Sequence, residues 1–162
     1  MSHLLGRILL IVFLCGTMIA CEKEELNSET PIDHIEMQYI SFELEVANVV
    51  NEHRKELGLP TLKLLNIISK EAESHSIYML EQESLNHDNL DIRVSNLINK
   101  ANALSVGENV AFGYSTPQAA LNAWIASAGH KANLEGDYSH YGVSIRIDND
   151  GRKYYTNMFI KK

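Results

Sequence analysis

Apolar residues first recur at helical spacing between residues 41 and 60. The pattern predicts a helix that begins at Ser41, taken as its N-cap, and ends at Gly58, with Pro60 beyond it as a stop. One face of this helix follows the i, i+3, i+4, i+7 and i+11 spacing and holds Val46, Val49, Val50, His53 and Leu57. We expect this face to pack against the core.

Two further helical patterns follow. The first starts after Asn66 and fades near Ser84, and its predicted buried face consists of Ile68, Ala72, His75 and Met79. The second covers residues 91–104 and is predicted to form around Ile92, Leu97 and Ile98. Histidines on such faces are expected to be packed and hydrogen-bonded rather than catalytic.

Residues 106–112 alternate instead with a period of two, which is typical of a strand and places Glu108 on a face with apolar side chains. Thr116 and Pro117 then open another helix as N-cap and first turn, and Gly129 is predicted to end it. Two final strands, 141–147 and 153–160, flank a tight turn at 148–151. Helices followed by strands indicate an α+β fold, with helices packed on a small, mainly antiparallel sheet.

The turn at residues 148–151, Asp-Asn-Asp-Gly, has some likeness to a calcium-binding loop. Arg152 falls where such a loop needs its next oxygen ligand, and no Glu follows at the twelfth position. A hairpin turn is therefore the better interpretation.

The N-terminus has a different composition. His3 and Arg7 precede residues 8–20, which carry no charge. This run is shorter than the roughly 20 apolar residues that span a bilayer, so it predicts a signal peptide over residues 1–20. Met18–Cys21 resembles the bacterial lipobox, which predicts lipidation of Cys21, with plain secretion as the alternative. We expect a flexible tether over residues 21–40 and one domain over residues 41–162.

Net charge and cysteine content limit the kinds of partner and of cross-link that the protein can have. The chain has 162 residues, with 14 Lys+Arg against 21 Asp+Glu and a formal net charge of −7. Such a chain, with no basic run, lacks the cationic surface that nucleic acid requires. Of its two cysteines, Cys15 would leave with the signal peptide and Cys21 would carry lipid. The domain must therefore fold without disulfides.

Four short motifs occur in a set order along the predicted domain. They are Asn51–Arg54, Gly107–Ala111, Trp124–Asn133 and Tyr154–Phe159. Together they resemble the CAP superfamily, which includes cysteine-rich secretory proteins, insect venom antigens and plant pathogenesis-related proteins, in its bacterial disulfide-free (SCP-like) form. The resemblance implies an extracellular protein with an α-β-α sandwich. It also implies a central cleft that, in some members, has two His and two Glu able to bind a divalent metal.

The resemblance assigns cleft residues position by position. The first His corresponds to His87, the first Glu to Glu108 and the second His to His130, whereas Ser127 stands in place of the second Glu. If His87, Glu108 and His130 converge, they offer three ligands to Zn²⁺ or another divalent cation and leave a position for water. A buried hydrogen-bond cluster that satisfies Glu108 is the alternative, and we favour it because no second carboxylate is available as a base.

Ser127 and His130 stand three residues apart, a spacing compatible with a nucleophile and its base. No oxyanion-hole motif or third group accompanies them, so no catalytic residue is assigned. The function we expect is a lipid-anchored protein of the bacterial envelope, at the outer membrane or cell surface. Its cleft and loops would bind a lipid, wall or protein ligand without catalysis. A metal-dependent or serine-type hydrolase is the alternative, and a vestigial cleft with interacting loops is a third hypothesis.

Overall fold

The computed structural model describes residues 36–162, so the predicted signal peptide, Cys21 and residues 22–35 of the predicted tether lie outside the described part of the chain. Within it, no helix is both long and apolar enough to cross a membrane. The elements run in the order α1 (Ser41–Glu56), β1 (Lys63–Leu64), α2 (Asn66–Glu81), α3 (Leu90–Ala101), β2 (Ser105–Phe112), α4 (Pro117–Ala126), α5 (Ala128–Leu134), β3 (His140–Ile147) and β4 (Lys153–Lys161).

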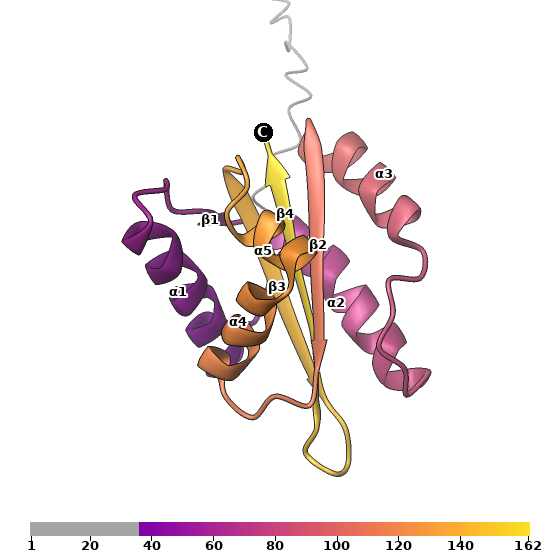
Figure 1. Cartoon of the computed structure of the whole chain (residues 1–162). Coiled ribbons are helices and arrows are strands. Elements are labelled where there is room, and N and C mark those ends of the chain that lie inside the picture. Colours follow the sequence, from indigo (N-terminus) through magenta and orange to yellow (C-terminus); the bar gives the residue numbers. More distant parts are fainter. Residues whose placement is uncertain (1–35) are drawn as a thin grey trace, which may run out of the picture. The chain divides into compact units, whose positions relative to one another are not determined.

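The described elements form an α-β-α sandwich. Its sheet has the strand order β1-β3-β4-β2, with β1 parallel to β3 and the other two pairings antiparallel. Helices α2 and α3 cover one face, while α1, α4 and α5 lie against the other (Figure 1). The strand β2, which carries Glu108, is thus an edge strand between the two helical layers.

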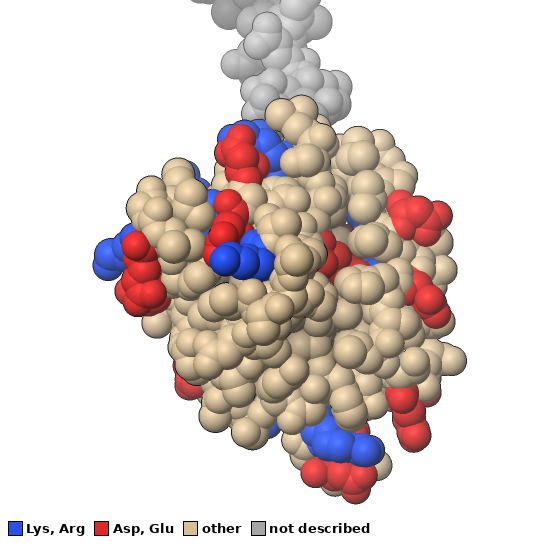
Figure 2. Space-filling view, viewed as in Figure 1, with Lys and Arg blue, Asp and Glu red and all other residues tan. Residues whose placement is uncertain are grey.

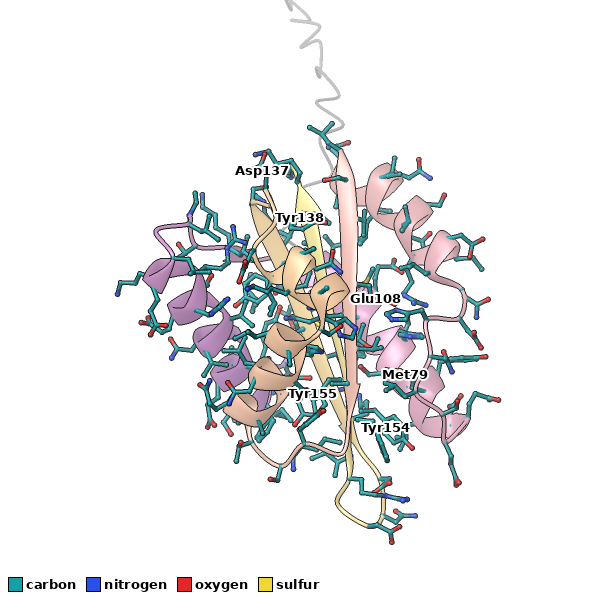
Figure 3. The ribbon with its side chains drawn as sticks, viewed as in Figure 1. Met79, Glu108, Asp137, Tyr138, Tyr154 and Tyr155 are labelled. Atoms are coloured by element: carbon teal, nitrogen blue, oxygen red, sulfur yellow. The ribbon has the colours of Figure 1, made fainter. Side chains whose placement is uncertain are left out.

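Alternation along β4 builds a separate core on each face of the sheet. Tyr155 and Phe159 point toward α1 and α4, and Tyr154 and Met158 point toward α2 and α3. Figure 3 shows Tyr155 on the α4 side and Tyr154, with Met79 of α2, on the other. All four β4 side chains are at most 2% exposed, and β4 is one of the two interior strands of the sheet.

Gly142 of β3 allows α2 to approach the sheet closely. A Cβ atom at this position would lie 2.2 Å from the backbone nitrogen of Ser69, far inside van der Waals contact. The hydroxyl of Ser69 accepts a hydrogen bond from the backbone N–H of Val143, at 3.2 Å. The first turn of α2 therefore rests directly on the backbone of β3.

Two residues of the first family motif cap backbone groups. The side-chain amide of Asn51 donates to the carbonyl of Leu62 and accepts from its N–H, at 3.0 and 2.8 Å. Arg54, which is 1% exposed, donates to the carbonyls of Pro60, Leu134 and Gly136. These contacts fix the loop after α1 and the end of α5, so the motif is structural at these two positions.

The first predicted N-cap is displaced by one residue. Ser41 lies inside α1, and the cap is Ile40, whose backbone N–H donates to the Glu43 carboxylate at 3.1 Å. The other oxygen of Glu43 accepts from the N–H of Ile145 at 2.8 Å. Glu43 can take this place because its carboxylate reaches both the start of the helix and β3.

Gly129 does not end a helix, contrary to the sequence prediction. The chain leaves α4 at Ser127, which has an extended backbone, and starts α5 at Ala128. Gly129 is therefore the second residue of a new helix. The predicted N-cap at Thr116 is confirmed, since its hydroxyl accepts from the N–H of Ala119 at 3.2 Å.

Of the three apolar residues around which α3 was predicted to form, only Leu97 is buried. Ile92 and Ile98 are about half exposed, and the buried residues are Arg93, Leu97 and Ala101. Apolar content alone favoured the isoleucines. The observed face is selected by the pairing of Arg93 with an acidic residue on β2.

Candidate functional site

Glu108 is the centre of the candidate site. Its carboxylate points from β2 toward the layer formed by α2 and α3 (Figure 3) and is fully buried. Arg93 of α3 binds it with two hydrogen bonds, from Nε to Oε2 at 2.7 Å and from Nη2 to Oε1 at 2.8 Å. Nη1 of the same guanidinium donates to the carbonyl of Asp88 at 2.7 Å. Both oxygens of the carboxylate are thus occupied by one bidentate cation.

His87 makes the third contact to this carboxylate, between Nδ1 and Oε1 at 2.7 Å. Burial opposes the charge on Glu108, but the His87 hydrogen bond and the Arg93 charge outweigh it and lower the Glu108 pKa below its usual value. An ionised carboxylate only accepts, so Nδ1 of His87 carries the proton. Nε2 lies on the side of the ring away from Glu108, and the side chain is 45% exposed.

His75 of α2 lies beneath this pair and is fully buried. Its Nε2 donates to the carbonyl of Asn86 at 2.9 Å and lies 3.9 Å from Oε1 of Glu108. Burial lowers the His75 pKa, and the charge of Arg93 lowers it further. The ring is therefore neutral at pH 7 and holds the loop immediately before His87.

His130 approaches from the opposite helical layer. Its ring centroid lies 6.4 Å from that of His87, and burial together with the nearby His87 lowers its pKa. The side-chain amide of Asn109 donates to the carbonyl of His130 at 2.9 Å. Asn133, one turn further along α5, donates to the carbonyl of Glu108 at 3.0 Å. These two asparagines fix α5 to the edge of β2 and so position His130.

A small cleft opens beside His130, with a volume of about 260 Å³. Its polar lining consists of Tyr114, Ser127 and His130. The lone tryptophan of the chain, Trp124, forms part of its wall and donates from Nε1 to the carbonyl of Val110 at 2.9 Å. The remaining lining is contributed by Leu85, Val110, Ala111, Phe112 and Ala123. None of these lining residues, all within the described domain, is an acid, a lysine or an arginine. The surface over α4 is likewise mostly uncharged on the face shown in Figure 2.

The structure gathers the residues that the resemblance singled out, but in two groups. His87 and Glu108 are in direct contact, and Ser127 and His130 line the cleft beside them. Among the contacts of residues 36–162, Ser127 makes no side-chain hydrogen bond to His130, so the pair has no nucleophile-base contact here. His53, in contrast, lies elsewhere and contacts the Glu135 carboxylate at 3.0 Å.

The fit to a divalent metal depends on Glu108. Arg93 takes both of its oxygens, and Ser127 replaces the second carboxylate of the resemblance. Across residues 36–162, no three His, Cys, Asp or Glu side chains are arranged to hold a metal ion. The residues as arranged therefore do not fit a cation bound through Glu108.

Arg93 was not predicted from the sequence, although a signal was present. Arg93, Leu97 and Ala101 follow the i, i+4 and i+8 spacing, so a charge lies on the apolar stripe of a helix. Glu108 likewise lies on an apolar strand face. Two buried charges of opposite sign in one domain predict a pair, because either alone would be costly to bury.

Known proteins are similar in sequence to this domain. The family model described as "CAP: Cysteine-rich secretory protein family" matches residues 47–159. The uncharacterized membrane protein YlbC of Bacillus subtilis is 32% identical over 126 residues, which cover 74% of this chain and 34% of the relative. The uncharacterized protein YkwD of the same organism is 29% identical over 126 residues, covering 75% and 48%. The chain thus spans about a third to a half of the length of these relatives.

Solved structures share the same fold. An outer surface protein of Borrelia burgdorferi superimposes with a TM-score of 0.67 at 22% identity, covering 78% of this chain and 99% of that one. An extracellular protein containing a SCP domain from Bacillus anthracis gives a TM-score of 0.63 at 27% identity, covering 74% and 40%. These similarities establish the sandwich as the fold of the described domain.

Proposed function

The chain belongs to the cysteine-rich secretory protein (CAP) family, and on that premise we propose that it is a lipid-anchored binding module of the bacterial envelope. The cleft beside β2 binds the apolar part of a lipid, wall or peptide ligand, and no chemistry follows. The observation that carries this proposal is the lining of the cleft, which combines the apolar side chains of Leu85, Val110 and Phe112 and the indole of Trp124 with a few polar groups, Tyr114, Ser127 and His130.

The state of Glu108 supports binding over hydrolysis. A general base must offer a lone pair to the proton that it removes. Both oxygens of this carboxylate already accept hydrogen bonds from Arg93, and one also accepts from His87. Arg93 and His87 thus fix Glu108 in place, which supports a structural role for this carboxylate rather than that of a base.

The size of the cleft limits what enters it. About 260 Å³ lies below the range of roughly 300–1,000 Å³ that is common for pockets holding drug-sized ligands. The cleft accordingly takes one short acyl segment or one apolar side chain. Ser127 and His130 would hydrogen-bond the polar group next to it.

Trp124 provides the test, because it is the only tryptophan and it lines the cleft. The full chain, purified in detergent, is titrated separately with sodium decanoate, with a soluble muropeptide digest and with a pool of short peptides. Tryptophan fluorescence is recorded throughout. We expect at least one probe to give a saturable change, because occupancy alters the surroundings of the indole. The absence of any saturable change would overturn the proposal.

Two variants of α4 separate binding in the cleft from binding elsewhere. Ala123→Leu fills the cleft and should abolish the response, whereas Ala126→Leu, on an exposed position of the same helix, should retain it. Equal responses from both would place the ligand elsewhere. Mass spectrometry of the incubated probes checks for cleavage, and product that accumulates with time would favour the hydrolase.

The location proposed is the cell envelope. In support, the two structural neighbours are named an outer surface protein and an extracellular protein. The anchor is tested by labelling expressing cells with an alkyne fatty acid. Cys21→Ala should lose the label, and Cys15→Ala, within the predicted signal, should keep it. Label that survives Cys21→Ala would rule out the proposed anchor.

A further inference from the structure

Arg93 binds the carboxylate that the family resemblance assigns to a metal site. We infer that Arg93 is the resident cation of this cleft and that it takes the carboxylate oxygens through which Glu108 would otherwise bind a divalent ion. The guanidinium reaches both oxygens, at 2.7 and 2.8 Å, and both side chains are at most 5% exposed. This inference concerns the charge of the cleft, so it does not depend on which ligand the cleft binds.

The position of the guanidinium is fixed by more than the carboxylate. Its remaining nitrogen donates to the carbonyl of Asp88, in the loop that carries His87. A metal ion that displaced Arg93 would leave a buried cation with no counter-charge, which is strongly unfavourable. Arg93 and the loop therefore hold one another in the arrangement that excludes the metal.

The charge balance of the cluster agrees with the uncharged cleft. Arg93 and Glu108 carry opposite charges and are in direct contact, so this pair has no net charge. A divalent ion held by one carboxylate would instead leave a net positive charge. The neutral ion pair suits the cleft next to it, whose lining includes no acid, lysine or arginine.

His87 acquires a different role in this arrangement. Its Nδ1–H is directed to Glu108, so Nε2 faces away from the carboxylate. In metal sites the same carboxylate contact orients a histidine whose other nitrogen binds the metal. In this chain Glu108 orients His87, and it is Arg93 that fixes Glu108.

The test uses Zn²⁺ alone as the probe. The full chain in detergent is dialysed against Zn²⁺, analysed for metal content and melted with and without Zn²⁺ by circular dichroism. We expect the wild-type chain to retain no stoichiometric Zn²⁺ and to melt at the same temperature in both conditions. Arg93→Gln should bind Zn²⁺ at least about tenfold more tightly than wild type, as expected when ligands are freed from a competing partner.

A matched double variant identifies the ligands. Adding His87→Ala to Arg93→Gln should remove the gained Zn²⁺ and the rise in melting temperature that it causes. If Arg93→Gln is unfolded without metal, folding on addition of Zn²⁺ gives the same answer, since metal binding and folding are coupled. No gain of Zn²⁺ in Arg93→Gln would overturn the role given to Arg93.

A second comparison needs no variant of Arg93. His87→Ala alters a side chain that is 45% exposed, so it should fold as wild type does. Stoichiometric Zn²⁺ in the wild-type chain that is lost in His87→Ala would overturn the inference directly. Equal, substoichiometric Zn²⁺ in both proteins supports it. Ligand binding is measured separately by Trp124 fluorescence, so failure of one proposal leaves the other testable.

Discussion

The guanidinium of Arg93 holds both carboxylate oxygens of Glu108, at 2.7 and 2.8 Å, across the gap between α3 and the edge strand β2. This pair ties the α2–α3 layer to the sheet at the point where His87 and His130 approach each other. It is therefore both a structural link and the element that sets the charge of the candidate site.

Removing the ion pair between Arg93 and Glu108 should destabilise the folded protein. Arg93→Met leaves the Glu108 carboxylate buried without its cation, and we expect the free energy of unfolding to fall by about 3–5 kcal/mol. Urea denaturation measures the change. Arg152→Met removes an exposed ion pair with Asp148 and should leave the stability nearly unchanged.

A double variant separates the cost of an unpaired charge from the value of the pair. Arg93→Met combined with Glu108→Leu should be less destabilised than the sum of the two single changes, because no lone charge stays buried. Additive losses in the denaturation series would show that the two residues act independently.

The lowered pKa of His75 predicts how the free energy of unfolding depends on pH. Its pKa in the folded protein lies below that in the unfolded chain, which is about 6.5. Below that pH the unfolded chain binds a proton that the folded protein refuses, so the free energy of unfolding falls as the pH drops. Arg93, Glu108, His87 and Tyr78 are the charged and titratable groups around it.

The measurement compares His75→Gln, whose amide can still donate to Asn86, with wild type across pH 5–8. We expect the variant to lose stability less steeply below about pH 6.5. The slope should not vanish, because burial also lowers the pKa of His130 and His140. Identical slopes in the two proteins would contradict the assignment.

Much of the fold could be predicted from the sequence because its signals are local. Helical and strand periodicity located most elements, and Thr116 and Pro117 marked the start of α4. The two-residue strand β1 was missed because it is too short for a period to show. The break between α4 and α5 at Ser127 was missed. Nothing in the sequence next to Ser127 distinguishes a short break between two helices from the end of a single helix.

The site was less predictable, since its contacts join distant segments. Nothing local connects Arg93 with Glu108, which lies 15 residues away on another element. The resemblance supplied His87, Glu108, Ser127 and His130, but a pattern of residue types does not state which neighbour neutralises a carboxylate. Only the packing of α3 on β2 selects Arg93 for that role.

Substitutions of Gly142 and Gly129 test the long-range packing and the local structure separately. Gly142→Ala would force a Cβ to within 2.2 Å of the backbone nitrogen of Ser69, so α2 must move. We expect a loss of about 1–3 kcal/mol or more in the free energy of unfolding, as for other overpacked sites. Neither residue is charged, so urea denaturation reports the packing effect alone.

Gly129→Ala tests the local structure in the opposite direction. A glycine that ended α4 would adopt a left-handed conformation that alanine resists, and the substitution would destabilise the protein. Gly129 instead lies within α5, its φ is not positive, and nothing lies within 4 Å of an added Cβ. Alanine in a helix is favoured over glycine by about 0.5–1 kcal/mol, so we expect a gain in stability of that size. A loss of stability would instead support a helix that ends at Gly129, as predicted from the sequence. His130 would then lie at a different position relative to His87.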